Sequence, residues 1–143
     1  KDILARAMGG RIAEQLIYGE DGITTGAGSD LRKATEIARD MVIEQGMGES
    51  LRDQVFHEDN GGLMFDKMTI ERPYSDETAK LIDQEVAQLI TEAKQRAMLV
   101  LKENRSFLDK LAEALLKDET LEESEVDEIL KDTKLPKEAK LHS

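Results

Sequence analysis

The chain has 143 residues, which suits a single domain, and its 20 basic and 31 acidic residues give a formal net charge of −11. Binding to nucleic acid depends on clustered Lys and Arg that release counterions, whereas the basic residues here are interspersed with acids. The same charge argues against binding to an anionic membrane surface. With no cysteine in the chain, disulfides and thiolate zinc sites are excluded.

The apolar residues are mostly aliphatic. Hydrophobic residues make up 39% of the chain and aromatic residues only 3%, a composition that favours packed helices over a β-sandwich. No apolar run approaches the roughly 20 residues of a membrane-spanning helix, and there is no signal peptide. The chain opens at Lys1 without a methionine, already in helical register, which indicates a piece of a longer protein. We predict an all-α fold, mainly a helical bundle.

Apolar residues at i, i+3 and i+4 spacing predict a first helix over residues 2–18, ended by Gly19. Gly9 and Gly10 lie in its middle, where each glycine costs roughly 1 kcal/mol relative to alanine. A plain helix crossing and packing beside a functional site would explain this pair equally well. Residues 22–29 are rich in Gly, Thr and Ser and predict a loop before a second helix over residues 30–45.

The second half of the chain predicts three more helices. Residues 47–74 are irregular, with a short β-hairpin as a candidate within residues 52–70. Ser75 is a good N-cap for a long helix over residues 76–104, and shorter amphipathic helices are expected over residues 107–117 and 123–131. One domain is predicted over residues 1–132, followed by a polar tail over residues 133–143 that is expected to be disordered.

Few residues of the chain suit catalytic chemistry. The only histidines, His57 and His142, lie far apart in the sequence. The helical H-E-x-x-H zinc motif is absent, as are a P-loop, a nucleophile elbow and a cysteine nucleophile. From residue chemistry alone the chain is a binding or structural module.

Two carboxylates nevertheless allow a functional interpretation. Asp30 follows the glycine-rich loop, where acids commonly cap a helix or balance its dipole, and this reading is favoured by the residues alone. Its alternative is a carboxylate displayed for metal binding, since a carboxylate can ligate zinc beside imidazoles. Glu14, four residues after Gly10, is either a solvated charge or an acceptor for the second nitrogen of a metal ligand.

These motifs, taken together, resemble the FtsH family of membrane-anchored AAA-plus zinc metalloproteases over nearly the whole chain, to about residue 131. The most specific block is Thr24-Thr25-Gly26-Ala27 followed by Asp30-Leu31. The other matching stretches are Gly9-Gly10-Arg11-Ile12-Ala13-Glu14, Tyr18-Gly19, Ala34-Thr35, Ala38-Arg39, Met41-Val42, Gly46-Met47, Tyr74-Ser75, Thr78-Ala79, Ile82-Asp83, Glu85-Val86, Leu101, Asn104-Arg105, Leu111-Ala112, Leu115-Leu116 and Glu119-Thr120-Leu121.

The resemblance implies a role for each matching site residue. Asp30 corresponds to the third protein ligand of zinc, which reverses the preference for a helix cap. Glu14 corresponds to an acidic residue beside the metal site that contacts a metal ligand without binding the metal itself. Thr24, Thr25 and Gly26 correspond to the rim of the cleft. The long helix and those after it resemble the scaffold of a protease ring, which is hexameric in this family.

The chain also lacks parts of the family pattern. The two zinc histidines and the general-base glutamate belong to an H-E-x-x-H helix upstream of Lys1, and the ATPase module that binds ATP and Mg and the transmembrane segments are also missing. Gly48 stands where the family usually has serine, and residues 52–72 match no pattern. The chain by itself is therefore expected to be inactive and not to hold zinc tightly, because one carboxylate is insufficient.

Two functions remain as hypotheses. The first is the C-terminal part of the proteolytic domain of an ATP-dependent protease that degrades membrane proteins and unfolded cytosolic proteins. That parent would lie in a bacterial inner membrane with this domain in the cytoplasm, or in an organelle membrane facing the matrix or stroma. The second is a non-catalytic helical oligomerisation or adaptor module that shares the peptidase scaffold. Because the H-E-x-x-H helix of the protease domain is missing, the chain alone is expected to be a monomer or to associate weakly.

Overall fold

The computed structural model of the chain describes residues 2–19, 26–56 and 74–139, and this part is helical without any β-strand. The predicted all-α fold is therefore confirmed. The five α-helices are α1 (Asp2–Tyr18), α2 (Gly26–Ile43), α3 (Asp76–Glu103), α4 (Arg105–Asp118) and α5 (Glu123–Leu130), and a 3-10 turn follows at Lys137–Ala139. No helix among these residues is both long enough and apolar enough to cross a bilayer.

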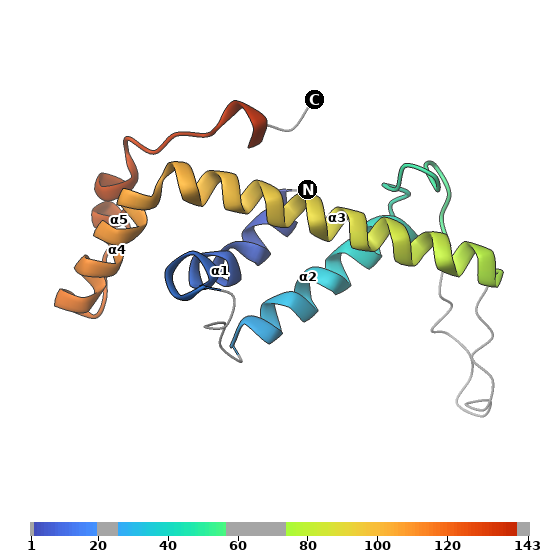
Figure 1. Cartoon of the computed structure of the whole chain (residues 1–143), viewed down its shortest axis with the longest axis horizontal. Coiled ribbons are helices and arrows are strands. Elements are labelled where there is room, and N and C mark those ends of the chain that lie inside the picture. The colour runs from blue at the N-terminus through green and yellow to red at the C-terminus, as the bar shows by residue number, and fades with distance from the viewer. Residues whose placement is uncertain (1, 20–25, 57–73, 140–143) are drawn as a thin grey trace.

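The long helix α3 organises the arrangement. In Figure 1 it runs along the longest axis of the molecule, with α1 and α2 against it and with α4 and α5 at its C-terminal end. Its start is fixed locally, because the backbone N–H of Thr78 donates to the hydroxyl oxygen of Ser75 at 3.2 Å. Ser75 is thus the N-cap of α3, as the sequence predicts, and the helix ends one residue before the predicted boundary.

The hydrophobic core lies where α1, α2 and α3 meet. Each helix contributes residues at three- and four-residue spacing, so each turns one apolar stripe inward. The most enclosed side chains include Leu4, Met8 and Ile12 of α1 and Ile82 of α3. Ala34 and Ala38 of α2 are completely buried. Their small side chains let α2 approach its neighbours closely, which brings the first turns of α2 against α1.

The turn after α2 is fastened to α3 by a buried carboxylate. Glu85 is 6% exposed, and its two oxygens accept the backbone N–H groups of Glu49 at 2.9 Å and Ser50 at 2.6 Å. A side chain at Gly48 would place its Cβ 3.1 Å from the carboxyl carbon of Glu85. The glycine at position 48 therefore leaves room for the Glu85 carboxylate.

A buried asparagine joins α3, α4 and the C-terminal segment. The side-chain amide of Asn104 donates to the carbonyl oxygens of Val100 at 2.8 Å and Lys134 at 2.7 Å, and its oxygen accepts the Lys134 N–H at 2.8 Å. These bonds hold the segment after α5 on α3, where Ala139 is buried. The segment of residues 134–139 is thus attached to α3 although Lys134 and Leu135 are exposed, whereas residues 140–143 lie outside the described part. The domain boundary at residue 132 stays a prediction.

Several predicted element bounds differ from the structure: α2 ends two residues before the predicted residue 45, and α4 begins two residues before the predicted residue 107. The helix α2 begins at Gly26, four residues before the predicted start at residue 30. Glycine in a helix costs roughly 1 kcal/mol relative to alanine, and the packing of α2 on α1 and α3 outweighs this cost here. Val55 and Phe56, which lie within the candidate hairpin at residues 52–70, are irregular. The rest of the hairpin, residues 57–70, lies outside the described residues.

Candidate metal-binding carboxylate at the crossing of α1 and α2

Asp30 lies in the second turn of α2, and the first turn of this helix carries no acidic residue. The interpretation of Asp30 as a helix cap or first-turn acid is therefore wrong. Its side chain is partly buried, and it is one turn before Ala34, which belongs to the core. Residues four apart share a helix face, so Asp30 continues the inward face of α2 toward its N-terminal end.

The neighbour of this carboxylate on α1 is Gly10. An alanine Cβ at position 10 would lie 3.2 Å from Oδ2 of Asp30, closer than ordinary van der Waals contact. The carboxylate therefore occupies space beside the helix that a side chain on α1 would need. The structure thus brings together two features that the sequence marks separately, Gly10 of the interior glycine pair and Asp30.

Glu14 lies one turn after Gly10 on the same face of α1 and is partly buried. This places a second carboxylate on the face of α1 that Asp30 approaches. Gly26 is the first residue of α2. Thr24 and Thr25, the other predicted residues of the cleft rim, lie outside the described residues. The role of Glu14 beside a metal and the role of the rim stay predictions.

The donor set in this chain fits zinc only in part. Asp30 offers a hard oxygen ligand that zinc accepts beside imidazoles. In the ranges 2–19, 26–56 and 74–139 no group of three or more His, Cys, Asp or Glu side chains is arranged to hold a metal ion. Both histidines fall outside these ranges. Asp30 therefore offers one carboxylate, and the described residues do not complete a metal-ligand set around it.

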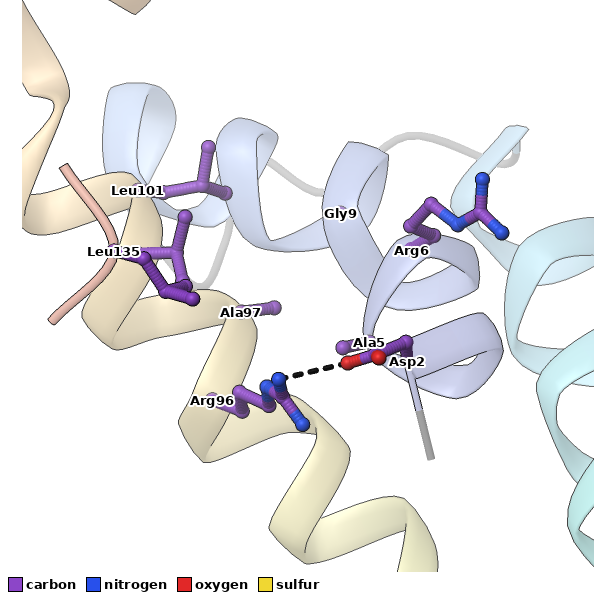
Figure 2. A pocket seen from close by; sticks show the side chains of 9 residues that line it. Asp2, Ala5, Arg6, Gly9, Arg96, Ala97, Leu101 and Leu135 are labelled. Carbon is purple, nitrogen blue, oxygen red and sulfur yellow. Dashed lines mark ion pairs between the residues drawn. The ribbon is translucent and has the colours of Figure 1, made fainter. Parts of the chain in front are cut away.

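A separate pocket of about 450 Å³ opens on another side of α1, and Figure 2 shows it from close by. Its walls are mainly aliphatic, from Ala97 and Leu101 of α3 and from Leu135. An ion pair between Arg96 and Asp2, with 2.7 Å between nitrogen and oxygen, also lines it. Asp30 and Glu14 are not among its lining residues. This pocket is therefore distinct from the candidate metal site.

Glu85 is a structural residue that the sequence analysis did not single out for its burial. The signal was present, because Glu85 follows Ile82 by three residues and precedes Leu89 by four, on the apolar stripe of α3. A carboxylate at such a position must be either paired or placed at the edge of the core. Its two backbone donors come from the turn after α2, which the periodicity of α3 alone does not reveal.

The fold is a helical scaffold domain that places the Asp30 carboxylate at the crossing of α1 and α2. The sequence matches the profile of peptidase family M41 over residues 1–129. It is 44% identical over 128 residues to ATP-dependent zinc metalloprotease FtsH 3 of Synechocystis sp., covering 89% of this chain and 21% of that protein. The chain belongs to peptidase family M41, and its resemblance to FtsH is confirmed.

Other relatives give the same result. Identity is 48% over 131 residues with ATP-dependent zinc metalloprotease FtsH of Akkermansia muciniphila, covering 90% of this chain and 16% of that protein. With FtsH of Bacillus subtilis it is 41% over 137 residues, covering 94% of this chain and 21% of that protein. The chain thus spans about a fifth of the length of the curated relatives it matches.

Proposed function

We propose that this chain is the C-terminal part of the proteolytic domain of an ATP-dependent zinc metalloprotease, in which Asp30 is the third protein ligand of zinc. The observation that carries this proposal is the Asp30 carboxylate, held on the inner face of α2 against the side-chain-free position Gly10. The names of the relatives support zinc and ATP dependence for the whole protein.

The zinc ligands are proposed to come from two parts of the whole protein. Asp30 supplies one carboxylate oxygen, while two imidazoles and the general-base glutamate come from an H-E-x-x-H helix outside this chain. A zinc ion held by such a set would supply Lewis-acid polarisation of the scissile carbonyl and activation of the attacking water. Within this chain the packing of α2 on α1 places the Asp30 carboxylate, and Glu14 would support the site from the face of α1 that Asp30 approaches. The family resemblance assigns Thr24, Thr25 and Gly26 to the rim of the cleft.

The whole protein is proposed to be a membrane-anchored homo-hexamer with an AAA-plus module that binds ATP and Mg. It degrades membrane proteins and unfolded cytosolic proteins as part of protein quality control. It lies in a bacterial inner membrane with this domain in the cytoplasm, or in an organelle membrane facing the matrix or stroma. Neither the charge of −11 nor its distribution suits a nucleic-acid partner.

The test is Asp30→Asn in the full-length protein. The amide is nearly isosteric but a much poorer zinc ligand, so we expect bound zinc and the ATP-dependent degradation of an unfolded substrate to be lost while ATPase activity persists. Zinc content by atomic emission, degradation of casein and phosphate release measure the three properties.

A zinc titration of the 143-residue chain alone provides the control. We expect it to show no sub-micromolar affinity that depends on Asp30, because one carboxylate is too small a ligand set. Full proteolysis by the Asp30→Asn protein would contradict the proposed ligand. It would favour the second hypothesis, in which this module contributes to oligomerisation but not to catalysis.

A further inference from the structure

We infer that Gly10 is a positioning residue for Asp30, because its missing side chain leaves the space in which the Asp30 carboxylate can reach the metal. The inference rests on the proposed function, in which Asp30 ligates zinc. Its geometric basis is the distance of 3.2 Å between an alanine Cβ placed at Gly10 and Oδ2 of Asp30. Ordinary contacts to a Cβ begin at about 3.4 Å.

Other reasons for a glycine at this position do not apply. Glycine inside a helix is destabilising relative to alanine, so a compensating need is expected. The backbone at Gly10 does not supply it, since the glycines with positive φ in the described part are Gly19 and Gly46. Burial does not supply it either, since Gly10 is exposed. Among the described residues, the Asp30 oxygen is the only atom outside α1 that a Cβ at position 10 would meet.

Gly9, the adjacent residue, has a different surrounding. A Cβ at Gly9 would meet nothing within 4 Å, and this glycine borders the separate aliphatic pocket (Figure 2). Gly9 and Gly10 share the same helix, nearly the same distance from its ends and the same backbone region. Replacing each by alanine should raise the helical preference of α1 equally, while only the change at Gly10 touches Asp30.

A methyl group at position 10 would displace the carboxylate by a few tenths of an ångström. Metal–ligand distances tolerate about 0.2 Å, so a displacement of this size strains one bond of the set. Loss of a residue that holds a metal ligand in place typically lowers metal affinity by about 10- to 100-fold. We expect Gly10→Ala to fall at the lower end, near tenfold, because Asp30 is only partly buried and can adjust.

The experiment compares Gly10→Ala with Gly9→Ala in the full-length protein. The zinc dissociation constant is measured by competition with a chromophoric chelator, and the ligand geometry by the visible absorption of the cobalt-substituted protein. We expect Gly10→Ala to raise the dissociation constant about tenfold and to change the cobalt spectrum. Gly9→Ala should leave both unchanged, and both variants should unfold at the same or a slightly higher temperature.

A positioning role predicts that Gly10→Ala weakens zinc binding while the unfolding temperature stays the same or rises. A purely structural defect would instead lower both the zinc affinity and the unfolding temperature. A Gly10→Ala protein with wild-type affinity and cobalt spectrum overturns the inference, and so does a Gly9→Ala protein weakened to the same extent.

Asp30→Ala keeps the outcomes for the inference and for the proposed function distinguishable. If Asp30→Ala weakens zinc binding and Gly10→Ala does not, only the positioning role is wrong. If Asp30→Ala leaves zinc affinity intact, the proposed ligand is wrong and the positioning role falls with it. In the Asp30→Ala background the effect of Gly10→Ala on affinity should vanish, since the two residues act through one contact.

Discussion

The helices α1, α2 and α3 differ sharply from α4 and α5 in how much they bury. Every residue of the hydrophobic core cluster lies in the first three helices or in the turn after α2. In contrast, α4 and α5 contain no buried residue, and Leu116 of α4 is 86% exposed. Both regions are regular amphipathic helices, so amphipathicity alone does not decide which of them belongs to the core.

The candidate metal site therefore lies in the well-packed part of the molecule, α1 to α3, and not in the exposed helices α4 and α5. Asp30 and Gly10 face each other across α1 and α2, whose packing on α3 is the core of the fold. The two later helices are joined to this unit at few points, among them the hydrogen bond from Arg105 to the carbonyl oxygen of Leu16 at 3.1 Å. Regions with few buried apolar contacts open at lower free energy than the core.

The largest expected effect is in the core. Ile12 is completely buried, so Ile12→Ala should lower the free energy of unfolding by about 2–5 kcal/mol. Leu116→Ala removes the same number of carbon atoms from α4 and should change it by less than about 0.5 kcal/mol. Urea unfolding of both variants, followed by circular dichroism at 222 nm, measures the contrast. Equal losses would mean that the exposed face of α4 is covered in solution.

The fold was predictable from the sequence wherever its determinants are local. Apolar periodicity predicts all five helices. Two predicted helix ends are also found in the structure: Ser75 is the N-cap of α3, and Gly19, with a φ of 79°, follows the last residue of α1. The start of α2 was not predictable in this way, because its glycines read as a loop. There the packing of the helix outweighs local propensity.

The candidate site was only partly predictable. Residue chemistry marked Asp30 and the glycine pair as separate features, and the family resemblance supplied the role of Asp30. Their contact joins two helices across an intervening segment and depends on how closely α2 packs on α1. The residue spacing within a single helix cannot predict a contact between two helices. Thr24 and Thr25 remain predictions from the resemblance alone.

A second, smaller effect is expected at the junction between the two regions. Asn104→Ala removes the side chain that binds the backbone of Lys134 and the carbonyl of Val100, and it should cost about 1–3 kcal/mol because buried polar groups lose their partners. Hydrogen exchange of residues 131–139 should accelerate strongly.

Lys134→Ala is the matched control, since Asn104 contacts only the backbone of that residue among the bonds described. This variant should keep both the stability and the exchange rates of the wild type. Wild-type exchange in residues 131–139 of the Asn104→Ala variant would show that other contacts hold the C-terminal segment on α3.

The smallest expected effects come from the helix caps, and they test whether α5 unfolds together with the core. Ser75→Ala removes the N-cap of α3, which packs on both α1 and α2, and should lower the free energy of global unfolding by about 1 kcal/mol. In α5 the side chain of Glu125 accepts the backbone N–H of Glu122 at 2.8 Å, as part of a capping box.

Glu125→Ala should therefore loosen only α5, because this helix buries nothing against the core. We expect faster amide exchange in residues 123–130 by NMR, with a urea midpoint within error of the wild type. A midpoint lowered as far as that of Ser75→Ala would mean that α5 and the α1–α3 core unfold as one cooperative unit. In that case the two regions would differ in burial but not in the free energy at which they unfold. Coupling through α4 and Asn104 would then carry the loss of the α5 cap to the whole fold.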